Sequence, residues 1–595
     1  MCGIFFSLTA AENPVLLDKN LRYLLTKRGP DEGSYSIGVR GARLNLFNHE
    51  GSARIWLSFA STVLSMRGDD VVRQPLTDSG KTGSILAWNG DAWKIAGQPI
   101  PEKNDTEIVF KHLLQATTQN YLSENYDEVP DSTQRVIEAI SKITGPFAFV
   151  FYDAVNFKLY FGRDCLGRRS LLWGLDEAGS LKICSLCDGF SPSSYFQEVE
   201  ADGIYMVEFE DDQDAALRTS SAVESLRFDV KNIQRIPWSH EALPTYHMLS
   251  PIPPMNKATP EGTPPPLTTT SFILRELEHR LRQSLALRIQ NVRPPPFAGN
   301  TNVKVAVLFS GGLDCTLLAR LAHDILPAKE SIDLLNVAFE NPRVVAAAAK
   351  GSESSYSSAY ESCPDRLTGR AAFAELRRVC PTRNWRFVAI DIPYVVTVSH
   401  RDTIKRLMRP HNTEMDLSIA CALYFAARGQ GTAIESQRAD AKPYPYKTPA
   451  RVLLSGLGAD ELFAGYARHG MAFARSGFEG LIEEIDLDVS RLGKRNLGRD
   501  NRVIAHWGRE ARFPFLDEDF VAWVVQTPVW EKCGFGVPGC PPTDTGIDPE
   551  KKALRLLALD LGLSSVARAK KRAIQFGSRT AKMEKGKTKG TDALS

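Results

Sequence analysis

The pattern of hydrophobic residues changes along the chain, and residues 1–212 contain mainly short apolar runs. Helical spacing is found there at 105–117 and 131–143. Short apolar runs bounded by Gly, Asn and Asp are typical of β-strands. The runs are CGIFFSL, RIWLSFASTVLSM, SILAWNG, FAFVFYD, KLYFGRD, SLLWGL and GIYMVEF. This half is therefore predicted to be an α+β domain of stacked antiparallel sheets.

From Val303 onward, strand-like and helix-like segments alternate. Strands are expected at 303–309, 332–339, 386–391 and 451–455. Helices are expected at 316–326, 369–380, 401–408, 415–428 and 549–561. The alternation predicts an α/β domain built on a parallel sheet.

The segments between these patterns suggest the domain boundaries. Residues 213–270 are predicted to be a weakly structured, Pro-rich linker, and a long helix is expected at 271–290. The α/β domain would span 271–578. The basic tail 579–595 is predicted to be disordered, and the low-complexity insertions at 344–362 and 434–448 are predicted to be surface loops.

One stretch of the α/β half suggests chemistry. The apolar run Val305–Phe309 leads into Ser310-Gly311-Gly312, and a helical segment with Asp314 near its start follows. A strand, a Gly-rich turn and a helix N-terminus together present backbone N–H groups to an anion, most often a phosphate. A simple tight turn is the alternative interpretation of the same three residues.

Composition narrows the class of protein. The chain has 595 residues, a net charge of +2 and ten cysteines. This charge gives no reason to expect nucleic-acid or membrane binding, and no run of about 18 apolar residues is present. Ten cysteines are too few for a disulfide scaffold of this length, so a reducing setting, cytosolic or nuclear, is expected. We predict a cytoplasmic location.

Cys2 directly follows the initiator methionine. Removal of Met1 would leave a cysteine with a thiol and a free α-amino group, whose pKa of about 7.7–8.0 suits it to act as base for its own thiol. A single early cysteine is more often an ordinary buried residue. Cys2 alone therefore does not decide between the two interpretations.

Further motifs follow Cys2 in a fixed order. They are KRGPDEG (27–33), WNGDAW (88–93), NDTEIVF (104–110), GPFAFVFYD (145–153) and FGRDCLGRRSL (161–171). Together they resemble the glutaminase domain of class II glutamine amidotransferases, and more closely the N-terminal half of asparagine synthetases. The resemblance implies that Cys2 attacks the glutamine amide and that Asn89 and Gly90 form the oxyanion hole. It also implies that glutamine contacts Asn89, Gly90, Asp91 and Asp105.

The second half carries motifs in a similar order. They are SGGLDC (310–315), LLSGLGADELFAGYARHG (453–470), WGREARFPFLDEDF (507–520), EKKALR (550–555) and KRAIQFGS (571–578). They resemble the ATP pyrophosphatase domain of asparagine synthetases, and most of all the branch of asparagine synthetase domain-containing proteins. The resemblance implies adenylation of a carboxylate, nominally that of aspartate, and its amidation with release of AMP and pyrophosphate.

The same resemblance implies roles for single residues. Lys551 would be catalytic, and Asp314 and Asp460 would bind Mg²⁺, a hard cation that prefers oxygen ligands. The residues implied to bind ATP are Leu308, Ser310, Gly311, Gly312, Asp314, Ala338, Ser455 and Gly456. The implied partners are the small molecules glutamine, ATP and aspartate, and the resemblance allows a homodimer.

The sequence departs from the family pattern at several positions. Val63 stands where the family has the arginine that grips the glutamine carboxylate, with Arg67 and Arg73 nearby. Asp91 replaces a glutamate, Cys315 replaces a serine of the phosphate loop, and Leu457 replaces a glutamate of the acceptor site.

Three hypotheses follow. The chain is a glutamine- and ATP-dependent amide synthetase, or a catalytically altered relative that retains ATP binding for a regulatory role, or an amide ligase that does not use glutamine. The departures at Val63 and Leu457 favour the second hypothesis. Retention of Cys2, Asn89 and Gly90 argues against the third.

Overall fold

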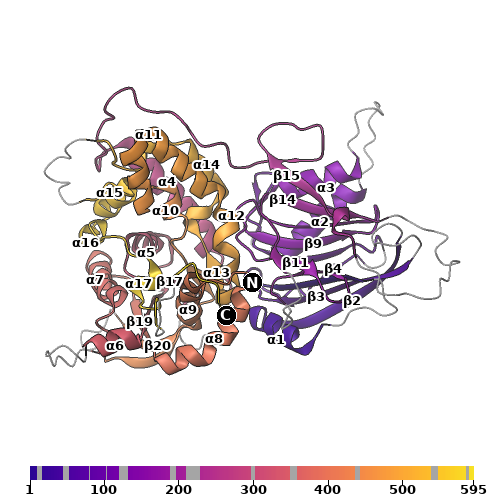
Figure 1. Cartoon of the computed structure of the whole chain (residues 1–595), viewed down its shortest axis with the longest axis horizontal. Coiled ribbons are helices and arrows are strands. Elements are labelled where there is room, and N and C mark those ends of the chain that lie inside the picture. Colours follow the sequence, from indigo (N-terminus) through magenta and orange to yellow (C-terminus); the bar gives the residue numbers. More distant parts are fainter. Residues whose placement is uncertain are drawn as a thin grey trace. The chain divides into compact units, whose positions relative to one another are not determined.

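The protein forms two compact units in the computed structural model (Figure 1). One unit comprises Met1–Pro251 with Gly493–Gly508, and the other comprises Ile252–Leu492 with Arg509–Ser595. The residues that the structure describes are 1–9, 17–43, 53–78, 81–101, 103–118, 131–187, 196–209, 228–295, 302–348, 358–435, 442–537, 547–583 and 589–594. Assignment of 1–212 and 271–578 to a glutaminase and a synthetase domain stays a prediction.

The first unit contains two large sheets, as the short apolar runs predict. The six-stranded sheet has the order β13 (Gln197–Glu198), β11 (Leu172–Leu175), β12 (Leu181–Cys184), β1 (Gly3–Thr9), β3 (Ala53–Val63), β2 (Glu32–Arg43). The seven-stranded sheet has the order β16 (Met248–Leu249), β15 (Gln234–Ser239), β14 (Gly203–Glu208), β10 (Lys158–Arg163), β9 (Phe147–Asp153), β5 (Ile85–Gly90), β4 (Leu76–Thr77). All pairs are antiparallel apart from β15 with β16.

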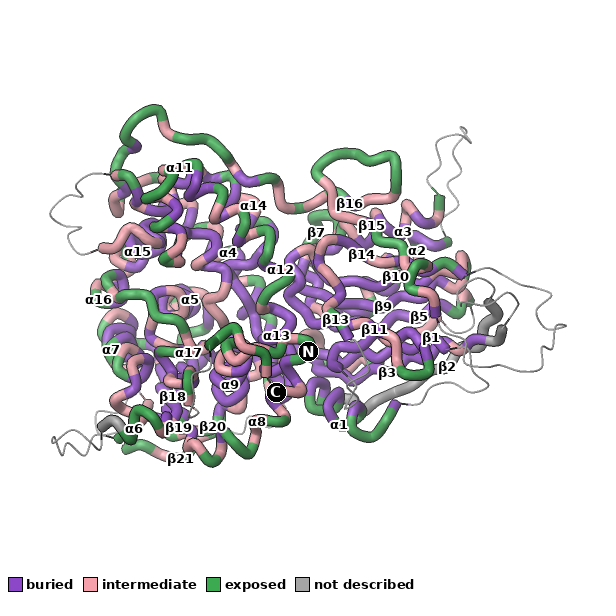
Figure 2. Tube along the Cα trace, viewed as in Figure 1, coloured by how far each residue is buried: buried purple, intermediate pink, exposed green. Residues whose placement is uncertain are grey.

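Alternate residues of the strands build the core between these sheets. Ile4 and Phe6 of β1 meet Ala87 of β5 and Val150 of β9 in one buried cluster. The other face of the seven-stranded sheet packs on helices α2 (Asp105–Thr118) and α3 (Ser132–Ser141). Helix α1 (Lys19–Arg28) contacts β1, β2 and β3, and a small sheet joins β7 (Gln98–Pro99), β6 (Lys94–Ile95) and β8 (Ile143–Thr144). Because both faces of β1 are covered, all seven of its residues are buried (Figure 2).

The second unit is built on one mostly parallel sheet. Its order is β21 (Tyr444–Lys447), β20 (Gln430–Glu435), β19 (Trp385–Ile392), β18 (Ile332–Phe339), β17 (Val305–Leu308), β22 (Val452–Leu454), β23 (Glu510–Arg512). Five neighbouring strands run parallel, namely β19, β18, β17, β22 and β23. Strands β20 and β21 form an antiparallel hairpin at one edge of the sheet. All eight residues of β18 are buried, as expected for a strand covered on both faces.

Helices accompany the parallel strands. The helices of this unit are α4 (Phe272–Ile289), α5 (Leu313–Ile325), α6 (Pro342–Ala348), α7 (Pro364–Val379), α8 (Tyr394–Met408), α9 (Glu414–Arg428), α10 (Ala459–Leu462), α11 (Ala467–Ser490), α14 (Glu518–Gln526), α15 (Lys552–Asp560), α16 (Ser564–Ala567) and α17 (Ile574–Gly577). Helix α12 (Leu492–Arg495) spans the unit boundary, and α13 (Leu497–Ala505) belongs to the first unit. No helix among the described residues is long and apolar enough to cross a bilayer.

The predicted fold class is confirmed, but several local predictions are wrong. Part of the expected linker forms β15, which extends the seven-stranded sheet by pairing with β14. The insertion 434–448 contains β21, and the insertion 344–362 begins inside α6. In the expected disordered tail, Gly590 and Asp592 accept backbone hydrogen bonds from Met415 and Glu414 at the start of α9. Residues 213–227 of the linker, and residues 584–588 and 595 of the tail, lie outside the described residues.

Candidate functional site

The glycine loop of the second unit joins β17 to α5 and has a conformation that requires glycine. Gly311 has a φ of +80°, and a Cβ there would lie 2.4 Å from the backbone nitrogen of Gly369 in α7. Gly312 is the N-cap of α5, with an ordinary φ of −72°. The close approach of the loop to α7 therefore fixes the backbone that carries the N–H groups of the helix start.

Side chains from the neighbouring elements hold the loop in place. The Thr368 hydroxyl donates to the carbonyl of Ser310 at 2.8 Å. The Asn336 amide on β18 donates to the carbonyls of Phe309 (2.9 Å) and Asp365 (2.8 Å). The loop is therefore rigidly positioned at the carboxyl ends of the parallel strands, where open α/β sheets bind their ligands.

Lys551 connects two carboxylates beside this loop. Its ammonium lies 2.8 Å from Oδ1 and 2.9 Å from Oδ2 of Asp314, and 2.9 Å from Oδ1 of Asp460. Asp314 lies in the first turn of α5, Asp460 in the first turn of α10, and Lys551 at the N-cap of α15. Three of the predicted site residues therefore meet at one point.

Burial and mutual attraction set the charges of this cluster. Burial raises the pKa of Asp314 above its ordinary value. Burial alone would also raise the pKa of Asp460, but Lys551 and Lys571 outweigh it and hold that pKa below its ordinary value. Burial would lower the pKa of Lys551, but the two aspartates outweigh it and raise the pKa. Lys551 therefore stays a cation throughout the neutral range.

Other predicted nucleotide-site residues adjoin the cluster. A Cβ on Gly456 would lie 2.6 Å from Asp314 Cβ and 3.2 Å from Cys315 Sγ, so the backbone at Gly456 packs directly on the start of α5. Ser455 precedes it, with its N–H bonded to the carbonyl of Arg512 at 3.0 Å. Burial raises the pKa of the Cys315 thiol to about 12, so this side chain is neutral.

Two further predicted residues lie on the strands rather than in the cluster. Leu308 is the last residue of β17 and precedes the loop, whereas Ala338 is buried near the end of β18. The role of Ala338 in ATP binding stays a prediction.

Sequence reasoning did not single out Lys571. Its ammonium lies 3.0 Å from Asp460 Oδ2 and 3.6 Å from the centre of the Tyr466 ring. The segment KRAIQFGS carries Lys571, but Lys570 and Arg572 beside it are also cationic, so the sequence could not say which of them reaches the site.

Cys2 of the first unit directly precedes β1, and its side chain is buried. Its thiol is 4.0 Å from the carbonyl of Leu64, and the Gln74 amide nitrogen lies 3.8 Å from Sγ. The amide oxygen of Gln74 accepts a hydrogen bond of 2.8 Å from the N–H of Trp88, which turns its nitrogen toward Cys2. Gln74 is a site residue that sequence reasoning missed.

Asn89 carries an unusual feature for a buried amide. It is 1% exposed, and neither its Oδ1 nor its Nδ2 has a hydrogen-bond partner among the described residues. An unpaired buried amide costs roughly 1–3 kcal/mol and calls for an explanation such as a ligand site. At Gly90, a Cβ would lie 2.6 Å from the Trp88 ring, so only glycine fits beside Asn89.

Asp105 and Asp91 form an acidic pair close to these residues. Asp105 Oδ2 accepts hydrogen bonds of 3.0 Å from Trp88 Nε1 and from the N–H of Ala92. Burial and the neighbouring Asp91 raise the pKa of Asp105 to about 6. Arg67 lies 3.2 Å from Asp91 Oδ1 and also donates to the carbonyl of Ala92 at 2.7 Å.

The departure at Val63 leaves an apolar, buried side chain at the end of β3. Arg67 is a nearby candidate to replace the missing arginine. Its two terminal nitrogens already donate hydrogen bonds to Asp91 and to the carbonyls of Ala92, Ile100 and Pro101. Arg67 therefore acts as an internal counter-ion of the acidic pair.

The segment Gly493–Gly508, distant in sequence but part of the first unit, is linked to Cys2 through Arg28. Arg28 is fully buried, and it donates from Nε to the carbonyl of Cys2 (3.4 Å) and from Nη2 to Asn501 Oδ1 (3.0 Å). Burial, with Arg502 as a further cause, lowers the pKa of Arg28 to about 9. Met1 lies over the same residues, with its sulfur 2.6 Å from Asn501 Nδ2.

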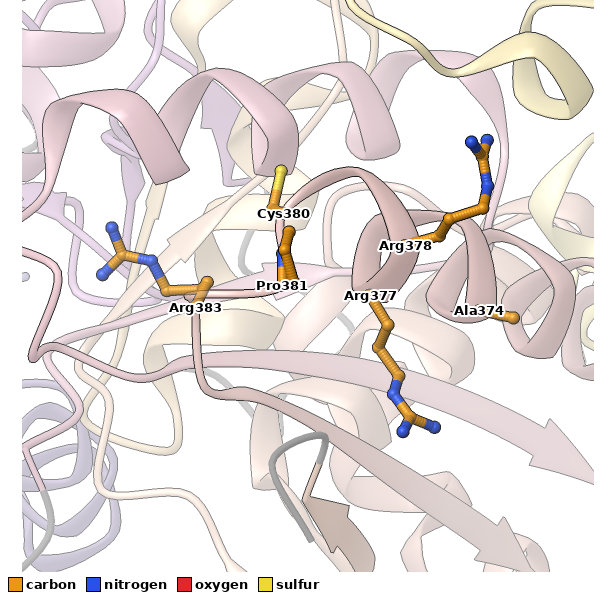
Figure 3. Close-up of a pocket in the computed structure, with 6 residues that line it drawn as sticks. All are labelled: Ala374, Arg377, Arg378, Cys380, Pro381 and Arg383. Carbon is orange, nitrogen blue, oxygen red and sulfur yellow. The ribbon is translucent and has the colours of Figure 1, made fainter. Parts of the chain in front are cut away.

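A cavity of about 400 Å³ lies elsewhere, at the amino end of β19. Ala374, Arg377, Arg378, Cys380, Pro381 and Arg383 line it (Figure 3). The three arginines point in different directions in Figure 3. Arg383 donates hydrogen bonds to four backbone carbonyls. The arginines of this cavity therefore do not converge on one point where an anion could bind.

The donor set near the glycine loop suits a hard cation. Among the described residues, no group of three or more His, Cys, Asp and Glu side chains gathers around one point. Asp314 and Asp460 nevertheless converge on one ammonium, so both could reach one ion. Mg²⁺ typically uses one or two carboxylates together with phosphates and water, and this pair fits that pattern.

A buried N-terminal cysteine on a β-sandwich and a glycine loop on an α/β sheet define an asparagine synthetase-like protein. The family model described as Asparagine synthase matches residues 479–590. Asparagine synthetase domain-containing protein 1 of Bos taurus is 34% identical, with 100% of this chain and 97% of that protein covered. The chain belongs to the family of asparagine synthetase domain-containing proteins.

Two more distant similarities were found. A putative glutamine-hydrolysing asparagine synthetase of Methanocaldococcus jannaschii is 47% identical over 79 residues, which cover 13% of this chain and 15% of that protein. The glutamine phosphoribosylpyrophosphate amidotransferase of B. subtilis, complexed with ADP and GMP, is 12% identical with a TM-score of 0.22, covering 57% of this chain and 66% of that one. A likeness of that size bears on no conclusion.

The two glycines of the loop provide a matched test of its geometry. Gly311→Ala should lower the free energy of unfolding by roughly 2–4 kcal/mol, because it adds a clash with α7 to an unfavourable φ. Gly312→Ala should change it by less than about 1 kcal/mol, since its Cβ would lie 3.4 Å from Ser310 Oγ. Urea unfolding of both variants measures the difference, and equal losses would contradict the loop geometry.

Proposed function

We propose that the protein is a glutamine-dependent, ATP-dependent amide synthetase, nominally forming asparagine from aspartate with release of AMP and pyrophosphate. The observation that carries the proposal is the meeting of Asp314, Asp460 and Lys551 beside the glycine loop. A phosphate-binding helix start, two carboxylates for a metal and one buried lysine are the groups that adenylation of a carboxylate needs.

In this proposal the loop residues Ser310, Gly311 and Gly312 hold the pyrophosphate part of ATP. Asp314 and Asp460 would hold Mg²⁺, which when bound would neutralise phosphate charge and orient the nucleotide. Lys551 stabilises the charge that develops as the acceptor carboxylate attacks the α-phosphate and pyrophosphate leaves. Ser455 and Gly456 lie toward the adenosine.

The first unit supplies ammonia. Cys2 attacks the glutamine side-chain amide after Met1 is removed, and its free α-amine takes the thiol proton. The Asn89 amide and the N–H of Gly90 stabilise the oxyanion, a role that accounts for the lack of partners at Asn89. Asp105 and Asp91 attract the α-ammonium group of glutamine.

A second candidate is a catalytically altered protein that binds ATP in a regulatory role. Two observations favour it. Val63 is apolar and cannot form a bidentate contact with a carboxylate. Leu457 places an aliphatic side chain beside Ser455 and Gly456, where the family carries an acid.

Asn89 offers a test that separates a functional amide from a structural one. Asn89→Leu should reduce glutaminase turnover by about 10²–10³-fold, as expected for loss of an oxyanion donor. It should raise the free energy of unfolding by roughly 1 kcal/mol, because it removes an unpaired buried amide.

Asn336→Leu is the matched control for this test. Asn336 is buried with its amide bonded to two carbonyls, so this variant should lose about 2–3 kcal/mol of stability. Released glutamate and urea unfolding are the measurements. A variant Asn89→Leu that is less stable with unchanged turnover would contradict the role of Asn89, and activity retained in Cys2→Ala would contradict a cysteine glutaminase.

Asp105 predicts the pH dependence of glutamine use. With a pKa of about 6, it loses its charge as the pH falls below 6, and with it the attraction for the α-ammonium group. The KM for glutamine should therefore rise about tenfold per pH unit below pH 6, while it stays flat above pH 7. Asp105→Asn should have a raised KM that does not respond to pH over the same range. A flat wild-type profile between pH 4.5 and 7 would contradict the assignment.

Exchange of pyrophosphate into ATP separates the two candidate functions. A synthetase should show exchange that aspartate stimulates and that Asp314→Asn abolishes. An altered protein should bind MgATP and show no exchange with aspartate. Binding of MgATP by calorimetry, measured alongside the exchange, distinguishes the second outcome from a protein that binds no nucleotide.

A further inference from the structure

Gln74 is buried beside Cys2 and is only 2% exposed. Its amide oxygen accepts a hydrogen bond of 2.8 Å from the N–H of Trp88, the β5 residue that precedes Asn89. Its amide nitrogen lies 3.8 Å from Cys2 Sγ and 3.5 Å from the hydroxyl oxygen of Thr106, in the first turn of α2. One side chain therefore links strand β5, the start of α2 and the sulfur of Cys2.

The hydrogen bond from Trp88 decides which way the Gln74 amide faces. A backbone N–H can only donate, so the atom that meets it must be the amide oxygen. The nitrogen is therefore the atom that faces Cys2 and Thr106, and it carries two N–H groups, one for each of them. A side chain that merely tied residue 74 to β5 would need the oxygen alone.

Two contacts of the Cys2 sulfur favour different protonation states. The carbonyl oxygen of Leu64, 4.0 Å from the sulfur, can only accept, so it stabilises the thiol that still carries its proton. The amide nitrogen of Gln74 can only donate, so it stabilises the thiolate. The thiolate is the nucleophilic form of cysteine. Gln74 therefore favours the reactive form of Cys2 over the resting form.

We propose that Gln74 is a positioning residue that donates a hydrogen bond to the Cys2 thiolate, stabilising it and fixing where the sulfur points. The inference rests on the proposed function, because it takes Cys2 as the glutaminase nucleophile. The backbone N–H of Trp88 holds Gln74 in turn. Strand β5 also carries Asn89, the oxyanion donor of the proposed function, so one strand positions both the nucleophile and the oxyanion donor.

Both halves of the proposed glutaminase cycle pass through a thiolate. In the first half, the thiol proton moves to the α-amine of Cys2, the sulfur attacks the glutamine amide, and the proton passes on to the nitrogen that leaves as ammonia. In the second half, water adds to the glutamyl thioester and the carbon–sulfur bond breaks. The sulfur leaves with the electron pair as a thiolate and then takes up a proton from that water. Gln74 keeps its own protons throughout, so its loss should lower kcat far more than it raises KM.

Gln74→Glu tests the proposal most sharply, because a carboxylate can still accept from Trp88 but cannot donate to the sulfur. The pH dependence of Cys2 alkylation by iodoacetamide, followed by mass spectrometry on the full chain with a free Cys2, reports the fraction of thiolate. Its midpoint should rise by roughly two pH units in Gln74→Glu, from the lost hydrogen bond and the added negative charge. Gln74→Met should raise the midpoint by about one pH unit, since it removes the hydrogen bond without adding a charge.

Gln115→Glu is the matched control, because it makes the same chemical change at an exposed position of α2. Its alkylation midpoint and its glutaminase kinetics should match those of the wild type. In both Gln74 variants, kcat for glutamine should fall about 10–100-fold, with KM within about threefold of the wild-type value. Labelling of Cys184 and Cys187, which are buried in the same unit, identifies a variant that has lost its fold, whereas loss of the donor changes the labelling of Cys2 alone.

The outcomes separate the inference from the proposed function. A wild-type protein that releases glutamate, with unchanged alkylation midpoints in both Gln74 variants, overturns the role of Gln74 alone, and so does an equal shift in Gln115→Glu. A wild-type protein that releases no glutamate, while the midpoints shift as expected, overturns the glutaminase and supports the hydrogen bond from Gln74 to Cys2. A Cys2 that iodoacetamide never labels in the folded wild type overturns both, because a thiol closed to that reagent is also closed to a glutamine side chain.

Discussion

The second unit depends on one electrostatic constraint, the compensation of two half-buried carboxylates by a buried lysine. Asp314, Asp460 and Lys551 come from the starts of three helices, and each helix start lies at the carboxyl edge of the sheet. Removing one partner of such a cluster leaves an uncompensated buried charge, which is typically far more costly than the net benefit of the complete cluster. The cluster therefore fixes where α5, α10 and α15 begin. Lys551 adopts a φ of 54°, unfavourable for a residue with a side chain, and this strain shows how strongly its position is imposed.

The first unit contains two energetically unfavourable features of a different kind, an unpaired buried amide and a pair of neighbouring acids. Asn89 is buried without a hydrogen-bond partner in the described part of the chain. Its neighbour Trp88 donates a backbone hydrogen bond to Gln74, whose amide nitrogen faces Cys2. An unpaired buried amide calls for a specific explanation, and a catalytic or ligand-binding role is one. The acidic pair Asp91 and Asp105 adds a second cost, because burial and mutual repulsion raise the pKa of Asp105. In the proposed function glutamine lowers both costs, because it carries an amide oxygen and an ammonium group.

Two of the departures from the family pattern, Val63 and Leu457, lie where the proposed function places a substrate carboxylate. In the proposed function, Val63 lacks a contact to the glutamine carboxylate and Leu457 lacks the acid of the acceptor side. Cys2, Asn89, Asp314 and Lys551 keep the residue types of the family pattern. Arg67 does not repair the first loss, because the acidic pair and three carbonyls occupy its guanidinium group.

Local sequence patterns determined a large share of the fold. The apolar runs and the strand–helix alternation gave the two architectures, and the expected strand 332–339 coincides with β18. Helix α11 was missed because glycines at 470, 477 and 480 interrupt its pattern, and its backbone kinks at Ser476 and Gly477. The hairpin strand β21 was missed because prolines and polar residues surround its two tyrosines.

The sequence by itself determined which residues could carry chemistry, because the glycine loop and the motifs are encoded within a few neighbouring residues. Only the tertiary structure decided which of these residues meet. Lys551 lies 237 positions from Asp314 and Gln74 lies 72 positions from Cys2, and no local pattern records such pairings. The choice of Lys571 over its cationic neighbours follows from the Tyr466 ring, and the place of segment 493–508 beside Cys2 follows from the way the units divide. Packing and burial act between distant positions, so they select partners that the order of residues along the chain leaves open.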